Sequence, residues 1–278
     1  MGLDEFINQL PEDDQSAINY ASLPELSRLT GPEASEFGQL WLEWSSERVL
    51  NIVERMVSLC ETQPDVEFEV IYKQGLNHPD PAVRVASLKG LDESEDRALV
   101  IPLSKILKSD PAPEVRTAAA IPLAHFAMMA ETGKLSMAYR ETLEDTLYGV
   151  LEDEQEIQDV KLKVMEAVSV FAAERLTTHI ELAWASGDLK ARQSSLFAMG
   201  QTSDPKWIGY VIPDLEHDAA SVRYEAAMAM GELGDEHHLR VMDAPLDDED
   251  LTVQLAAISA VERIGGDVAK AKLELKLS

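Results

Sequence analysis

Histidine and glutamate are the residues of this chain that could build a catalytic metal site. Adjacent His and Glu side chains on facing helices can hold two iron ions. The chain contains six histidines: His78, His125, His179, His217, His237 and His238. None is followed by Glu, and the reverse pairs at 216–217 and 236–237 fall in expected turns between helices. The sequence therefore predicts no di-metal site.

The remaining reactive residue types also lack a pattern that chemistry requires. Cys60 is the only cysteine and lies on an apolar helical stripe, so we expect a buried, inert thiol. The acidic clusters at 152–154 and 247–250 lack the ligand spacing of a calcium loop, and capping and first-turn charge account for them. Phosphate-binding glycine loops and a Gly-x-Ser-x-Gly nucleophile motif are absent. We therefore expect no catalytic, cofactor-binding or metal-ligating residue and no cofactor, which favours a protein that is not an enzyme.

The charge balance is strongly acidic. Asp and Glu number 51 against 24 Lys and Arg, which gives a formal net charge of −27. Nucleic acids and anionic membranes both need a basic patch, so we expect neither as a partner. The excess acid is explained by a self-repelling surface, by attraction of a basic partner, or by a salt-adapted host. The acidic N-terminus and single cysteine favour a cytoplasmic location.

A short pattern recurs through most of the chain and predicts the elements that position every side chain. Each copy contains a hydrophobic residue followed by a basic or polar anchor. The anchors are Arg84, Arg116, Lys161, Arg192, Arg223 and Gln254, with spacings of 32, 45, 31, 31 and 31 residues. A period of about 30 residues indicates stacked helical repeats. We expect each repeat to be two antiparallel helices, with Val83, Val115, Val160, Val222 and Val253 buried.

The repeat at 203–234 illustrates the local signals. Pro205 is suited to the first turn of one helix, and Asp218 is expected to cap the second. Gly231 and Gly234 are expected to end that second helix. Its inward positions are mostly small and apolar, which allows close stacking of equivalent helices.

These residues resemble HEAT repeats, in particular the short type of the phycobilisome bilin lyases. The resemblance rests on the Asp-x-x-Val-Arg start, the Ala-rich second helix and its terminal Gly-Asp, and it covers about residues 66 to 265. It implies an all-α, right-handed α-solenoid (a HEAT-like superhelix). In that family an Asp six residues before the Arg often pairs with it. Here only Asp110 and Asp248 hold that place, and the second precedes Gln254, so a continuous Asp–Arg ladder is not expected.

The domain plan follows from where the pattern starts. Residues 1–62 lack it but contain an apolar stripe from Val49 to Cys60 after a plausible cap at Ser45 or Ser46, so we expect an N-terminal helical cap. Residues 63–278 are expected to form one continuous domain of about six helical pairs. The unit around 111–160 is irregular, with Pro122 inside a helix that ends near Glu131. A final helix is expected at 267–277.

The second helices present further side chains one and five residues after each anchor. In two successive repeats these are Gln193, Phe197, Tyr224 and Met228. Second helices line the concave surface of a HEAT solenoid, so these residues would form a patch that binds a partner. The alternative is that they pack under adjacent helices. We expect a non-enzymatic interaction scaffold that binds a protein or peptide of basic or amphipathic character on its concave face. The alternative is a bilin-lyase-like or chaperone-like protein that handles a cofactor or a modified substrate protein.

Overall fold

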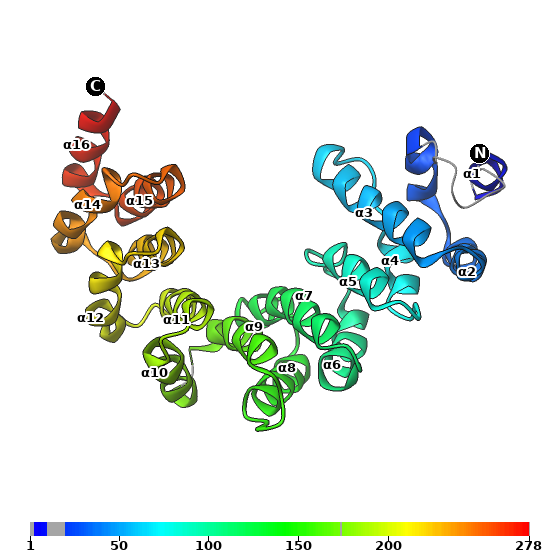
Figure 1. Cartoon of the computed structure of the whole chain (residues 1–278), viewed down its shortest axis with the longest axis horizontal. Coiled ribbons are helices and arrows are strands. Elements are labelled where there is room, and N and C mark those ends of the chain that lie inside the picture. Colours follow the sequence, from blue (N-terminus) through cyan, green and yellow to red (C-terminus); the bar gives the residue numbers. More distant parts are fainter. Residues whose placement is uncertain (1–2, 10–19, 173, 278) are drawn as a thin grey trace. The chain divides into compact units, whose positions relative to one another are not determined.

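Helices are the only regular elements in the described part of the chain. The computed structural model describes residues 3–9, 20–172 and 174–277 (Figure 1). The predicted all-α solenoid-like fold is confirmed. By contacts the chain forms two compact units, residues 1–126 (unit 1) and 127–278 (unit 2). No helix within the described ranges has both the length and the apolar character needed to cross a bilayer.

In unit 1, the helices of the N-terminal segment stack on the helices of the first repeat, although this segment lacks the repeat pattern. Its elements are α1 Leu3–Gln9, η1 Tyr20–Arg28, α2 Gly31–Leu40, η2 Trp41–Glu43, α3 Ser46–Thr62, α4 Glu69–Gly75, α5 Pro81–Lys89, η3 Arg97–Leu99, α6 Val100–Ser109 and the start of α7 Pro113–Glu131. Helix α2 packs on α4, and α3 packs on α5. The helices α2 and α3 therefore continue the two-layered packing without its sequence motif. Residues 1–2 and 10–19 of the predicted cap lie outside the described residues.

Helix α3 follows from the signals in its sequence. The Ser45 hydroxyl accepts a hydrogen bond from the Arg48 amide at 3.3 Å, which satisfies one of the free amides at the helix start. The stripe of Val49, Ile52, Val53, Met56 and Val57 is buried. Cys60 at the end of the stripe differs from expectation, because it is only half-buried and its Sγ lies 3.7 Å from the Tyr72 hydroxyl.

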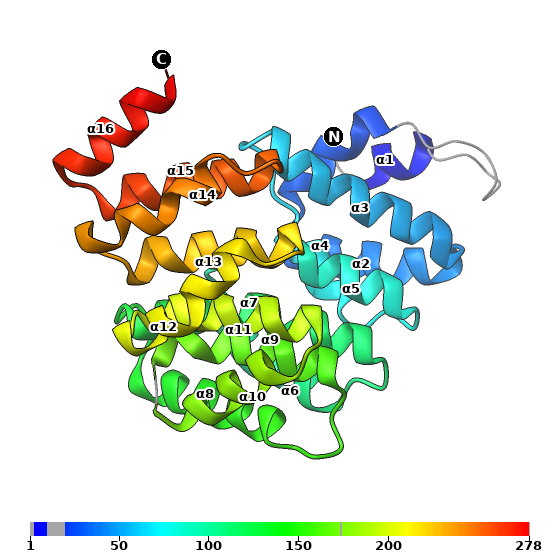
Figure 2. The same ribbon diagram turned by 60° about the vertical axis from the view of Figure 1, so that its left-hand side comes forward.

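Unit 2 contains the more regular repeats. Its elements are the end of α7, α8 Met137–Leu151, α9 Gln158–Val168, η4 Ser169–Phe171, η5 Glu174–Leu176, α10 Thr177–Ala185, α11 Leu189–Thr202, η6 Pro205–Trp207, α12 Ile208–Val211, η7 Ile212–Glu216, α13 Ala220–Leu233, η8 Glu236–Met242, α14 Asp243–Leu246, α15 Leu251–Ile264 and α16 Gly266–Leu277. Helices α9, α11, α13 and α15 pack in succession and form what we term the second-helix layer (Figure 2). The first helices of each pair, including α10 and α12 with η7, pack against this layer from one side.

The predicted interior positions are confirmed. All five repeat valines, Val83, Val115, Val160, Val222 and Val253, have no exposed surface. Helix α7 contains Pro122 and ends at Glu131, and Gly133 follows with a φ of +75°. The final segment is the helix α16, as predicted.

The predicted cap of α13 is wrong. Aspartate caps the second helix four residues before the anchor in three repeats, at Asp80, Asp188 and Asp250. In α13 that position is Ala219, whose methyl group cannot accept a hydrogen bond, and Asp218 lies one residue too early. The His217 ring nitrogen Nδ1 instead accepts the Ala219 amide at 3.0 Å. Gly231 lies inside α13, and Gly234 is the C-cap residue of this helix.

Gly231 has a packing role that gives a testable prediction. A Cβ atom at this position would lie 2.9 Å from the Ala260 Cα of α15, so the two helices are closer than a side chain permits. We expect Gly231→Ala to lower the free energy of unfolding by about 1–2 kcal/mol through overpacking, measured by urea denaturation. Gly209→Ala is the control, because a Cβ there meets nothing within 4 Å. Equal midpoints for the wild type and Gly231→Ala would contradict this packing account.

Candidate functional site

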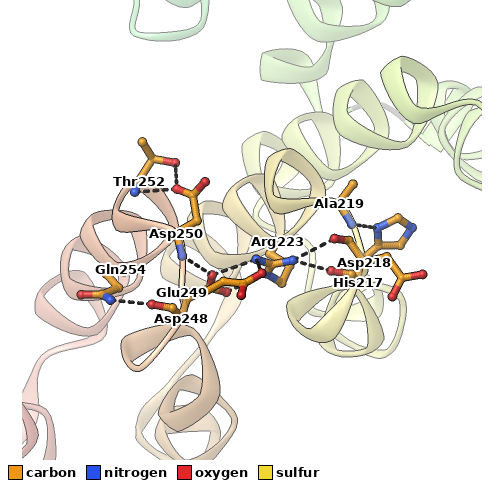
Figure 3. Close-up of polar contacts among 9 residues, drawn as sticks. All are labelled: His217, Asp218, Ala219, Arg223, Asp248, Glu249, Asp250, Thr252 and Gln254. Carbon is orange, nitrogen blue, oxygen red and sulfur yellow. Dashed lines mark hydrogen bonds and ion pairs between the residues drawn. The ribbon is translucent and has the colours of Figure 1, made fainter.

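The polar network at the start of α13 and α15 connects successive repeats (Figure 3). Arg223 donates to both carboxylate oxygens of Asp248, at 2.6 Å from Nε and 2.8 Å from Nη2. Its Nη1 donates to the His217 and Asp218 carbonyls at 2.9 and 3.1 Å. The guanidinium therefore fixes the preceding turn and the following repeat at once. A bidentate pair of this kind is among the stronger protein hydrogen bonds.

The same connection recurs in both units. Arg84 pairs bidentately with Asp110 in unit 1, and Arg192 pairs bidentately with Asp214 in unit 2. Each aspartate lies in the following repeat, 22 to 26 residues after its arginine. The sequence predicted that Asp248 has no arginine partner, because Gln254 stands six residues after it. This prediction is wrong, since Asp248 pairs with Arg223 of the preceding repeat. Gln254 itself donates to the Asp248 carbonyl at 2.5 Å.

The electrostatics of this network indicate a structural role. The hydrogen bonds from Arg223 hold the pKa of Asp248 below its usual value, and they raise the pKa of Arg223. Both side chains are nearly buried, and all their strong partners belong to the chain. The network therefore fixes neighbouring repeats relative to one another.

The four predicted partner-binding residues lie on two neighbouring helices of the second-helix layer. Gln193 and Phe197 are on α11, and Tyr224 and Met228 are on α13. Phe197 has 39% of its surface exposed, and the other three are half-buried. Gln193 donates to the Ser221 hydroxyl at 3.0 Å, which links the two helices at one end of the set. The residues are thus partly packed and partly presented to solvent.

The next repeat extends this surface. Leu255 of α15 follows its anchor by one residue, as Gln193 and Tyr224 do, and it is 57% exposed. Helix α13 packs against both α11 and α15. We name the exposed sides of Phe197, Tyr224, Met228 and Leu255 the apolar row. An apolar row on adjacent helices is a feature that protein interfaces use.

The carboxylates of Glu166 and Glu225 on the second-helix layer were not predicted from the sequence. Glu166 of α9 accepts a hydrogen bond from Ser194 of α11 at 2.5 Å and one from Lys163 at 2.6 Å. Glu225 of α13 holds the same place in its repeat as Ser194, two residues after the anchor. In the described residues no hydrogen bond or ion pair joins Glu225 to another side chain. A Glu among the small residues of a packed helix face is the signal that could have found it.

Glu225 is electrostatically strained. Burial raises its pKa to about 7, with a further rise from the charge of Glu166 that Lys163 partly offsets. The neutral, protonated form of this carboxyl group therefore persists to higher pH than in a solvated glutamate. A cationic group brought next to it would favour the ionised form.

The equivalent surface of unit 1 is a groove between α3 and α5. It has a volume of about 620 Å³, and Leu50, Val57, Val85 and Lys89 are among its lining residues. Val85 and Lys89 follow the anchor Arg84 by one and five residues. A second pocket of about 690 Å³ lies at α4 and α6, where Leu76, Ile101 and Lys105 line it. In unit 1, too, the positions after the anchor are presented to solvent.

His78, His217 and His238 occupy structural positions at the starts of helices. His78 accepts the Asp80 amide at 3.1 Å, and its carbonyl accepts from Arg84 at 2.8 Å. Burial lowers the pKa of His78. His238 caps η8 together with Asp235. Within the described ranges, no three His, Cys, Asp or Glu side chains gather where one metal ion could bind them.

Comparison with known proteins supports the repeat assignment. A family model described as HEAT repeats matches residues 176–262, which run from the start of α10 into α15. A search of curated protein sequences gives no match to the chain. Among solved structures, human deoxyhypusine hydroxylase in complex with glycerol is similar to this chain with a TM-score of 0.39 and 14% identity. That match covers 84% of this chain and 96% of the other.

Proposed function

We propose that this chain is a non-enzymatic interaction scaffold that binds a protein or peptide on the second-helix layer of unit 2. The observation that supports the proposal is the apolar row, which occupies the first and fifth positions after the anchors on α11, α13 and α15. A side chain such as Phe197 keeps a rigid apolar ring in solvent, which costs free energy in the absence of a partner. Tyr224 adds a ring with a polar end, which suits an interface that retains water. A cytoplasmic location is part of the same proposal.

The double substitution Phe197→Ala with Tyr224→Ala tests the scaffold function. Both side chains are part-exposed, so we expect the helical circular dichroism to remain near that of the wild type. Capture of the partners that the wild type retains should fall at least about tenfold, because aromatic anchors dominate binding energy at interfaces. Quantitative mass spectrometry of proteins captured from the native host measures this ratio.

The control for this experiment is Leu182→Ala. Leu182 is 66% exposed but belongs to α10, outside the second-helix layer. Its substitution should leave capture unchanged. If the double variant unfolds, Phe197 and Tyr224 belong to the hydrophobic core and do not form a binding surface. If it folds and still captures the same partners, the binding surface lies elsewhere on the protein.

The alternative function is bilin-lyase-like or chaperone-like handling of a cofactor or modified protein. Its support is the resemblance of the repeat motif, which concerns fold and does not identify a site. Co-expression with a biliprotein and its bilin tests it directly. A visible-absorbing adduct that depends on this chain would favour the alternative over the scaffold.

A further inference from the structure

The carboxylate of Glu225 lies on the second-helix layer and makes no hydrogen bond or ion pair with the other described residues. Position two after the anchor is Lys163, Ser194, Glu225 and Ala256 in four successive repeats. Lys163 and Ser194 both donate to Glu166. Glu225 has no such partner among the described residues, although it is half-buried and burial of an unpaired carboxylate is unfavourable.

The repeat register places Glu225 at the apolar row. Glu166 lies five residues after the anchor Lys161, and it contacts Ser194, which lies two residues after the next anchor, Arg192. By the same relation between α11 and α13 we expect Phe197 beside Glu225, since Phe197 is five residues after Arg192 and Glu225 is two after Arg223. Met228 lies one helical turn beyond Glu225 on the same side of α13. A carboxylate with aromatic and thioether neighbours is a chemically specific surface.

The charged groups around Glu225 do not neutralise its carboxylate, so a cation from a partner could pair with it. From α9 it faces the carboxylate of Glu166 and the ammonium of Lys163, which is already bonded to Glu166. Helix α11 contributes the uncharged Ser194, which donates to the same Glu166, and Ala260 of α15 packs at Gly231, six residues beyond Glu225. The carboxylate on the far side of α13, Asp214 of η7, is bonded to Arg192. Among the described residues, Lys163 is the cation whose charge reaches Glu225, and it is already bonded to Glu166.

We propose that Glu225 is the recognition point for a lysine or arginine side chain of a partner peptide, whose apolar residues occupy the apolar row. This inference rests on the proposed scaffold function and names the class of its partner. The long apolar stem of Lys or Arg would lie along Phe197 while its charged end reaches the carboxylate. A second copy of this chain, with its own net charge of −27, does not offer this complementarity.

The pairing has a defined dependence on pH. Glu225 is protonated below its pKa of about 7 and loses its attraction for a cation there. Bound cation favours the ionised form, so binding releases protons from the fraction that is neutral. Affinity for a basic peptide should therefore increase as the pH rises from 6 to 8.

Selection from a displayed library of random 12-residue peptides, with the full chain as the target, tests the inference. Peptides enriched on the wild type should place Lys or Arg between apolar residues. We expect these peptides to bind Glu225→Gln about tenfold more weakly at pH 8, and to bind that variant with little dependence on pH between 6 and 8. The matched control is Glu249→Gln, which removes the same charge from a side chain that is 92% exposed.

The outcomes separate this inference from the scaffold function. Peptides that lose binding in the Phe197→Ala, Tyr224→Ala variant but bind Glu225→Gln as tightly as the wild type would overturn the role of Glu225 and keep the scaffold. Equal weakening by Glu225→Gln and Glu249→Gln would show attraction by net charge alone, which also overturns the inference. Peptides unaffected by all these variants, or a library with no enrichment, would overturn both proposals.

Discussion

Replacement of Asp248 by alanine is expected to lower the free energy of unfolding of the α13–α15 region by about 3–5 kcal/mol. The substitution removes both carboxylate acceptors of Arg223 and leaves its charge in a site where the two side chains are only 11% and 6% exposed. In a repeat protein such a loss falls on the interface between neighbouring repeats. Urea titrations read by hydrogen exchange of peptides from α13 and α15 measure it locally.

The control for Asp248→Ala is the adjacent Glu249→Ala. The Glu249 carboxylate is 3.9 Å from the Arg223 guanidinium but almost fully exposed, so its loss should change stability by at most about 0.5 kcal/mol. The pKa of Asp248 is lowered, so its stabilisation is present above the ordinary pKa of Asp and is lost as the pH falls through the folded value. A cost below about 1 kcal/mol for Asp248→Ala would show that the ladder contributes little.

The helices of the repeats could be predicted from the sequence because their signals are local. The spacing of the anchors and the apolar residues around them located the buried Val222 and the long helix α7 with its break at Gly133. The caps were predictable where Asp stands four residues before the anchor. The start of α13 was mispredicted because Ala219 occupies that position and the His217 ring replaces the cap.

The Arg–Asp ladder was not predictable in the same way. The aspartates lie 22 to 26 residues after their arginines, because the loops and first helices between them differ in length. Asp214, for example, lies in η7, nine residues before Arg223, and no fixed offset would have found it. The unpaired state of Glu225 depends on what the neighbouring helices bring to it, which only the packed structure shows.

Glu225→Gln is expected to stabilise unit 2 at pH 8 by about 1–3 kcal/mol. The folded protein holds the Glu225 proton more tightly than the unfolded chain, since burial raises its pKa to about 7 from an ordinary value of 4.5. The wild type should therefore lose stability as the pH rises between these two values. Glutamine has nearly the same shape and no charge, so the variant lacks this loss.

Stability measured at pH 5 and pH 8 checks this expectation. The wild type and Glu225→Gln should be close in stability at pH 5 and differ at pH 8, whereas Glu249→Gln should follow the wild type at both. Parallel pH profiles for the wild type and Glu225→Gln would mean that the Glu225 carboxylate is well solvated. That result would also remove the reason to expect a cation beside it.

Site-specific photocrosslinking in the native host tests most directly whether the second-helix layer of unit 2 binds a partner. A p-benzoylphenylalanine residue is placed either at Phe197, on the apolar row, or at Leu182, which is exposed on α10. The account predicts a defined crosslinked protein from position 197 that is absent from position 182, with a basic segment at the crosslinked site. The same adducts from both positions, or adducts from position 182 alone, would contradict the account.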